Sequence, residues 1–173
     1  MSLSMHQASV AAFNRTLRAL SANLDKAEAH ATARKIEPSA LTTARLYPDM
    51  FTFARQVQLT CDFAKNSCWR LTGIEAPVFE DKEASFAELK ERIAKTLDFI
   101  NGIKADSFDG AHEREVTLKL PNGEHRLKGS DYLVFFALPN FYFHATTAYD
   151  ILRHCGVEIG KRDFFGAIPM RMT

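Results

Sequence analysis

The stretch 138-LPNFYFHATTAYDILRHCG-156 decides the fold of this chain. After Pro139 it contains no proline or glycine until Gly156, and its apolar residues recur three and four positions apart. Proline is accommodated in the first turn of a helix, and glycine commonly follows the last turn. The stretch therefore predicts an amphipathic helix that begins at Leu138 or Pro139, after a shorter turn, and ends near Cys155.

Two polar residues lie on the side of this helix that is otherwise apolar and is expected to face the core. Asn140 and His144 are four positions apart, which places their side chains on adjacent turns of one face. A lone histidine on an apolar face is more often a hydrogen-bonded core residue than a ligand. The pair is nevertheless the feature of the sequence that points most directly to a site.

Three other segments have the same helical periodicity. They cover about 3–33, the residues between Asp49 and Gly73, and 85–101. Ser85 and Glu88 have the spacing of a capping box, in which each side chain bonds the backbone of the other residue. The connection 73–85 contains a proline and several charges, so we expect an exposed loop.

A period of two replaces the helical period at 116–127. Apolar residues alternate with polar ones from Val116 to Leu120, Asn122-Gly123 suits a tight turn, and Leu127 lies on the return strand. Together these patterns predict an all-α fold: an antiparallel four-helix bundle with a small β-hairpin between the third and fourth helices. A chain of 173 residues suits one domain, which we expect to span 1–173.

The segment after Gly156 contains apolar residues without a clear period, namely Ile159, Phe164, Phe165, Ile168 and Met170. Apolar side chains in a terminal segment require cover, either from the bundle or from a second copy of the chain. We favour the bundle and expect the segment to be ordered in part.

The charge balance argues against two classes of partner. Lysine plus arginine total 22 and aspartate plus glutamate 21, so the net charge of +1 is too small to recruit nucleic acid or anionic lipid. No apolar run reaches the roughly 20 residues of a membrane span, and the N-terminal segment does not resemble a secretory signal peptide. The three cysteines fit small buried hydrophobes in a reduced, cytoplasmic protein.

Common catalytic signatures are missing from the sequence. It contains no glycine-rich phosphate loop, H-E-x-x-H, C-x-x-C or G-x-S-x-G motif. Near the start of the second helix, Gln56 and Gln58 lie beside a buried stripe, and only one of them can point inward. Taken alone, each glutamine is expected at the surface.

The segments 138-LPNFYFHATTAYDILRHCGVEIGKRDF-164 and 44-ARLYPDMFTFARQVQ-58 resemble a bacterial family of unknown function within the DinB/YfiT-like superfamily. The resemblance covers essentially the whole chain. It implies an antiparallel four-helix bundle, frequently a homodimer. In better-studied relatives one histidine near the start of the second helix and an H-x-x-x-H pair on the fourth hold a divalent metal, and some of them are thiol-dependent transferases or hydrolases.

Carried over residue by residue, this metal site is incomplete here. The H-x-x-x-H pair falls on Asn140 and His144, and the histidine of the second helix falls near Gln56, so one imidazole of three is retained. Amide oxygens are weak ligands for zinc or nickel, which favour imidazole or thiolate. The resemblance therefore implies a degenerate site that holds a metal poorly, if at all.

Three hypotheses for the function follow, and whether the chain is an enzyme stays open. The favoured one is a small-molecule-binding bundle, working as a homodimer, in which His144, Asn140 and Gln56 line a pocket without a cofactor. The alternative is a divalent-metal-dependent thiol transferase or hydrolase, in which the same three residues hold zinc or nickel. The third is a structural or interaction module whose aromatic-rich face packs against a partner.

Overall fold

The computed structural model describes residues 3–167 of the chain. Its long helices are α1 (Ala12–Arg34), α3 (Phe53–Thr72), α4 (Phe86–Gly102) and α6 (Leu138–His154). The shorter helical segments are the π-helices η1 (Gln7–Ala11) and η3 (Leu133–Ala137), the 3₁₀-helix η2 (Ala105–Phe108), and the α-helices α2 (Pro38–Thr42), α5 (Gly129–Tyr132) and α7 (Lys161–Phe165). The strands β1 (Glu115–Leu120) and β2 (Gly123–Lys128) form an antiparallel hairpin. A mostly helical fold with one small hairpin is thus confirmed.

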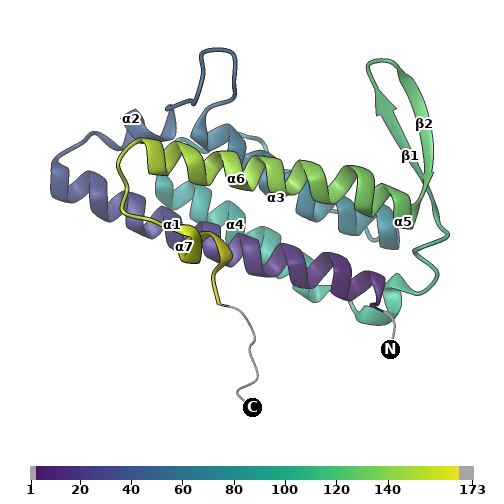
Figure 1. Ribbon diagram of the computed structural model, residues 1–173. Coiled ribbons are helices and arrows are strands. Elements are labelled where there is room, and N and C mark those ends of the chain that lie inside the picture. The colour runs from purple at the N-terminus through teal and green to yellow at the C-terminus, as the bar shows by residue number, and fades with distance from the viewer. Residues whose placement is uncertain (1–2, 168–173) are drawn as a thin grey trace.

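The long helices lie side by side along most of their length, with the hairpin at one end and α2 at the other (Figure 1). In this arrangement α3 packs against α6 and α4, while α1 packs against α4 and α6. Residues of α3 and α6 that are far apart in the sequence therefore meet along a shared seam, where the residues predicted to form a site also lie.

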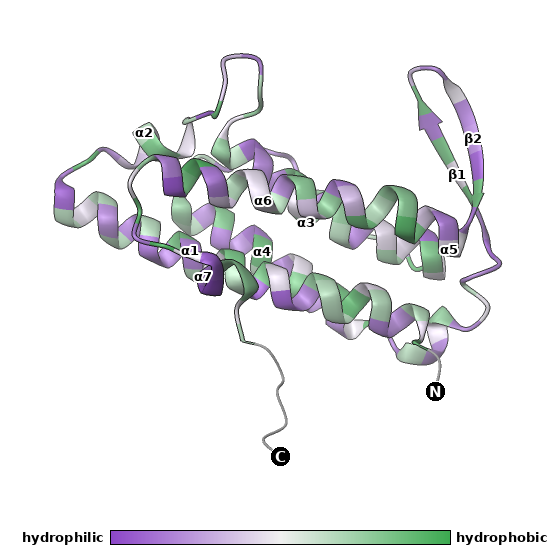
Figure 2. Cartoon of the chain, viewed as in Figure 1, coloured by the Kyte–Doolittle hydropathy of each residue, from purple (hydrophilic) through white to green (hydrophobic). Residues whose placement is uncertain are grey.

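The predicted helical stripes form the core. Phe13 of α1 meets Phe141 of α6 edge to face with ring centroids 4.7 Å apart, and Phe53 of α3 meets Phe86 of α4 at 6.3 Å. Figure 2 shows that each long helix carries both hydrophobic and hydrophilic residues, as expected of helices that bury one side. Each buried side chain of this size contributes about 1.5–3 kcal/mol to folding, which makes the stripes the main source of stability.

Helix boundaries follow the capping residues. The capping box of Ser85 and Glu88 is present, and Thr52 caps α3 by accepting a hydrogen bond from the Arg55 N–H at 3.3 Å. Gly73 ends α3 with φ of 82°, a left-handed conformation that glycine adopts without steric cost. These contacts satisfy backbone groups that a helix end would otherwise leave unpaired.

The approach to α6 is more regular than the sequence suggested. α6 begins at Leu138 as predicted, but the chain before it is helical from Gly129 onward, through α5 and the π-helix η3. Pro139 has no N–H to donate to the carbonyl of Phe135, and the wider hydrogen-bond spacing of a π-helix accommodates such an irregularity in a continuous helix.

The hairpin forms as predicted, but its two-residue turn is Pro121-Asn122 rather than Asn122-Gly123, because Gly123 is already the first residue of β2. Val116 pairs with Leu127, and Leu120 pairs with Gly123 across the turn. Val116 and Leu118 of β1 are buried, whereas β2 is mostly exposed and hydrophilic (Figure 2). One side of one strand therefore holds the hairpin against the helices.

The segment after Gly156 packs on its own chain up to Ala167. Val157 and Ile159 are buried, α7 packs against α1, and the Phe164 ring lies 5.7 Å from Tyr149 of α6. This agrees with the expectation that the helices cover the segment; Ile168 and Met170 lie outside the described residues. Within 3–167, none of the helices combines the length and the apolar character that crossing a lipid bilayer requires.

Candidate functional site

His144 and Gln56 meet at the seam between α3 and α6. Nδ1 of His144 lies 2.8 Å from Oε1 of Gln56, and both side chains are buried, with exposed fractions of 8% and 1%. The Gln56 amide nitrogen donates in turn to the carbonyl of Phe51, at 3.4 Å. Two of the three residues expected at a site are therefore in direct contact.

This contact determines which ring nitrogen of His144 is available. Because the amide oxygen of Gln56 only accepts, Nδ1 carries the proton and donates it, and Nε2 keeps its lone pair. Among the described residues no hydrogen-bond donor reaches Nε2. The Phe63 ring stacks on the imidazole with centroids 5.5 Å apart, and the Phe143 ring meets it edge to face at 5.3 Å. The pair thus offers one acceptor between aromatic rings.

The environment keeps this imidazole neutral. Burial lowers the pKa of His144 below its ordinary value, and the positive charge of Arg55 lowers it further. At neutral pH the ring is therefore an acceptor at Nε2 rather than a cation. A neutral imidazole of this kind can accept a proton or a hydrogen bond from a ligand.

Asn140 does not contact this pair by a hydrogen bond. Its amide nitrogen donates to the carbonyl of Phe136 at 2.7 Å, one turn back in η3, and the side chain is half-buried. The amide therefore helps to satisfy the backbone beside the π-helix. It lies on the same side of α6 as His144, but its amide nitrogen is directed along its own helix.

The donor set does not fit the metal centre that the resemblance implied. Gln56 accepts from Nδ1, so its oxygen and the lone pair on Nε2 lie at different edges of the imidazole and cannot bind one ion together in this arrangement. The Asn140 amide is engaged with the backbone. Within the described part of the chain, no group of three His, Cys, Asp or Glu side chains is placed to hold a metal ion. Gln56 acts here as the residue that orients the histidine.

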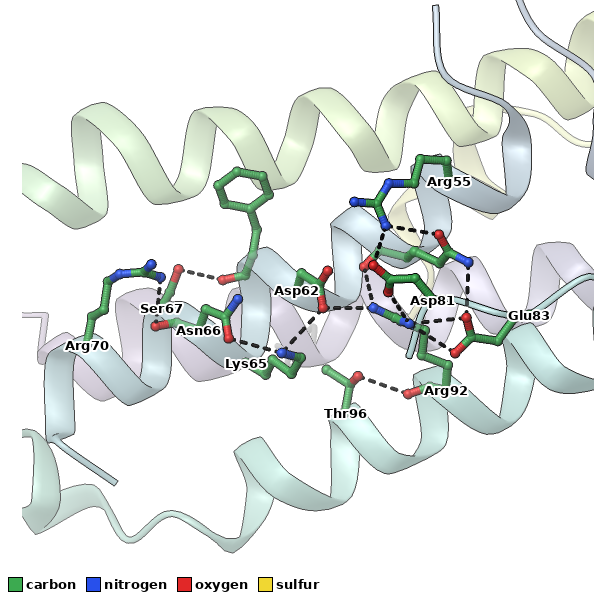
Figure 3. A network of polar contacts seen from close by, with 12 residues as sticks. Arg55, Asp62, Lys65, Asn66, Ser67, Arg70, Asp81, Glu83, Arg92 and Thr96 are labelled. Atoms are coloured by element: carbon green, nitrogen blue, oxygen red, sulfur yellow. Dashed lines mark hydrogen bonds and ion pairs between the residues drawn. The ribbon is translucent and has the colours of Figure 1, made fainter. Parts of the chain in front are cut away.

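A second polar cluster centres on Arg92 of α4, whose side chain is 1% exposed (Figure 3). Its guanidinium nitrogens lie 2.8 Å from Asp62, 2.7 Å from Asp81 and 2.9 Å from Glu83. The ring of Phe79 covers the guanidinium, 4.8 Å from its centroid. One buried cation thus joins α3, α4 and the 73–85 connection.

The Arg92 cluster refines one expectation and corrects another. The 73–85 connection is a mostly exposed loop, as predicted, but Phe79 and Glu83 turn inward to Arg92. Gln58, expected at the surface, is buried and donates to Glu83 at 3.0 Å. Both glutamines near the start of α3 point inward because the connection covers one and α6 covers the other. The sequence did contain one signal for this cluster. Arg92 lies beside the apolar stripe of 86–100, and a buried arginine requires carboxylate or other polar partners.

Electrostatics in this cluster stabilise its charges. Burial raises the pKa of Asp81, but its hydrogen bonds and charge interactions with Arg55 and Arg92 outweigh that effect and hold the pKa below its ordinary value.

Burial raises the pKa of the Cys61 and Cys68 thiols to about 12, so both are protonated at neutral pH. Protonated buried thiols are poor nucleophiles and serve as packing groups, as the sequence indicated.

Comparison with known proteins places the chain in a family. Residues 5–165 match a family described as a domain of unknown function, DUF1993. The chain belongs to the DUF1993 family. A search of the curated proteins found no match.

A solved structure extends this DUF1993 assignment. The chain is similar to a crystal structure at 1.83 Å resolution described as a DinB family member protein from Shewanella denitrificans. The two share 40% sequence identity, with a TM-score of 0.91 over 98% of this chain and 96% of that one. The resemblance to DinB-like proteins of unknown function is therefore confirmed.

Proposed function

We propose that this DUF1993 protein binds a small molecule through the His144–Gln56 pair, without a resident transition metal. The observation that carries the proposal is the 2.8 Å contact from Nδ1 of His144 to Oε1 of Gln56, which leaves Nε2 as an oriented acceptor. The ligand that fits has a flat apolar group, which packs against Phe63 or Phe143, and an O–H or N–H donor for Nε2.

The supporting framework is part of the proposal. We infer that the long helices form the antiparallel four-helix bundle predicted from the sequence, as one domain, and that the protein works in the cytoplasm as a homodimer. The exposed aromatic side chains of Phe135 on η3 and Phe143 on α6, 74% and 56% exposed, support a role for this continuous helical stretch in pairing.

The metal-dependent alternative has weaker support. A divalent ion at this seam would have one imidazole lone pair, Nε2 of His144, and would need to move the oxygen of Gln56 out of its hydrogen bond with Nδ1. The amide nitrogen of Asn140 is held by the Phe136 carbonyl, which leaves only its oxygen as a weak ligand. Thiol transfer or hydrolysis at such an ion would require that rearrangement first. The third reading, an interaction module, gains support from the exposed aromatics of α6 alone.

Phenol and benzene provide a matched pair of probes for the binding proposal. Both present a flat apolar ring, but only phenol has a donor for Nε2 of His144. Isothermal titration is expected to show that phenol binds the wild type about tenfold more tightly than it binds His144→Phe, the difference that one hydrogen bond supplies. Benzene is expected to bind both proteins equally. Equal phenol affinity for the two proteins, or no phenol binding to either, would refute the role of Nε2.

A further inference from the structure

A hollow lies between α1 and α7, the two helices that Figure 1 shows next to each other. Its volume is about 560 Å³, within the range of cavities that bind small molecules. Alanines of η1 and α1 form much of its wall, including Ala19 and Ala22. It shares no lining residue with the His144–Gln56 pair.

Positive charge is concentrated around this hollow. Arg15 and Arg18 of α1 and Arg162 of α7 line it, and none of the three has an ion pair with a carboxylate within the described chain. Arg18 donates through Nε to Oδ1 of Asn14 at 3.0 Å, a neutral partner. Guanidinium groups without a carboxylate partner favour an anionic ligand.

The carboxylate of Asp163 in the lining does not neutralise these arginines. Its Oδ1 lies 2.6 Å from Nζ of Lys26, and its Oδ2 accepts from the Gly160 N–H at 2.7 Å. The Lys26 contact holds α7 against α1, and the Gly160 contact caps the start of α7. They fix the backbone that carries Arg162, while leaving its guanidinium free of an acidic partner among the described residues.

The end of α7 is fitted closely to α1 at this point. Gly166 has φ of 63°, and a Cβ at this position would lie 3.1 Å from Cβ of Ala19. A side chain there would be strained in backbone conformation and crowded against the wall of the hollow. The distance between α7 and α1, and hence the width of the hollow, depends on this glycine.

We propose that the hollow between α1 and α7 binds a small organic carboxylate that has an apolar body. The arginines receive the carboxylate, and the alanine wall contacts the apolar body. This site is separate from the His144–Gln56 pair, so the outcome of its test is independent of the function proposed above.

Hippurate is a suitable probe because it combines a carboxylate and an aromatic ring. Titration calorimetry of the full chain is expected to show hippurate binding and at least about tenfold weaker binding of its uncharged methyl ester. Arg162→Gln is expected to weaken hippurate binding about tenfold, whereas Arg153→Gln, which removes the same charge from the exposed end of α6, should leave it unchanged.

Three results would overturn the proposal. They are no binding of hippurate at millimolar concentration, equal binding of hippurate and its methyl ester, and equal losses in Arg162→Gln and Arg153→Gln. Tenfold tighter binding of phenyl phosphate than of hippurate would overturn the choice of a carboxylate. Arg162 is exposed, so its variant is expected to fold, and circular dichroism of each variant checks this before titration.

Discussion

His144 has two ring nitrogens with different roles. Nδ1 is bound to a glutamine that is itself 1% exposed, whereas Nε2 has no donor among the described residues. One nitrogen therefore serves the packing of α6 on α3, and the other is the acceptor that the proposed function assigns to a ligand. Substitutions can separate the contribution to stability from the proposed contribution to binding.

Replacing His144 with alanine is expected to lower the free energy of unfolding by about 1–3 kcal/mol. The change leaves Oε1 of Gln56 without its donor and opens space beside Phe63. Urea denaturation of His144→Ala against His154→Ala, an exposed histidine in the same helix, measures the effect. Equal losses in the two variants would contradict the structural role of the Gln56 contact.

The stability of the protein is also expected to depend on pH through His144. Its folded-state pKa is lowered, so the unfolded chain binds a proton at a higher pH than the folded one does. The contribution is complete above the ordinary histidine pKa of about 6.5 and is lost as the pH falls through the lowered folded value. Urea denaturation at pH 7.5 and 5.5 should show a larger acid-side loss for the wild type than for His144→Phe. Identical losses would show that burial does not disfavour the imidazolium.

Restoring the relatives' histidines tests where their metal site falls on this chain. The double variant Gln56→His, Asn140→His is expected to bind zinc or nickel, because it places three imidazoles at the seam in the pattern of those relatives. Titration of the folded double variant with zinc, beside the wild type, measures the gain. A folded double variant that gains no affinity would refute this placement.

At the scale of elements, Arg92 connects the 73–85 segment to the helices on either side of it. The segment has no regular secondary structure, so its position depends on side-chain contacts such as those from Asp81 and Glu83. Arg92→Leu is expected to lower the free energy of unfolding by about 2–4 kcal/mol, somewhat less than for a fully buried pair because the carboxylates retain contact with water. Lys95→Leu, which removes an exposed ion pair one turn away, should cost less than about 1 kcal/mol.

Proteolysis locates the effect of the Arg92 substitution. Limited digestion of Arg92→Leu should cut first within 73–85, at a rate above that of the wild type, because the segment loses its charged contacts to α4. Digestion of Lys95→Leu should match the wild type. Unchanged protection of 73–85 in Arg92→Leu would mean that Phe79 and Gln58 hold the segment without the ion pairs.

At the scale of the whole molecule, pairing through η3 and α6 is the expected assembly. Phe135 is 74% exposed, so Phe135→Glu should leave folding intact while placing a charge in the proposed contact. Sedimentation should give twice the 19.5 kDa chain mass for the wild type and for Val78→Glu, an exposed apolar residue of the 73–85 segment, but the monomer mass for Phe135→Glu. A monomeric wild type would refute the homodimer.

Much of the architecture could be predicted from the sequence because periodicity and capping are local. The Ser85–Glu88 box and the Pro139 start of α6 each act within a few residues. The Asn-Gly pattern located the hairpin, but the turn lies one residue earlier, at Pro121-Asn122. The candidate site was predicted less completely. His144 and Gln56 were placed at one site only through a family resemblance. No local pattern showed that Gln56 would accept a hydrogen bond from the imidazole of His144 rather than act beside it as a metal ligand. The Arg92 cluster depends on contacts between three separate segments, which no spacing rule specifies.

The measurement that tests the central claim most directly is the nitrogen-15 NMR spectrum of the His144 ring at neutral pH, with and without phenol. The account predicts a protonated Nδ1 and an unprotonated Nε2 in the free protein, and a shift of the Nε2 signal when phenol is added, with no comparable shift for benzene. A proton on Nε2 in the free protein, or an Nε2 signal that phenol leaves unchanged, would contradict the claim that Gln56 holds this imidazole as a ligand acceptor.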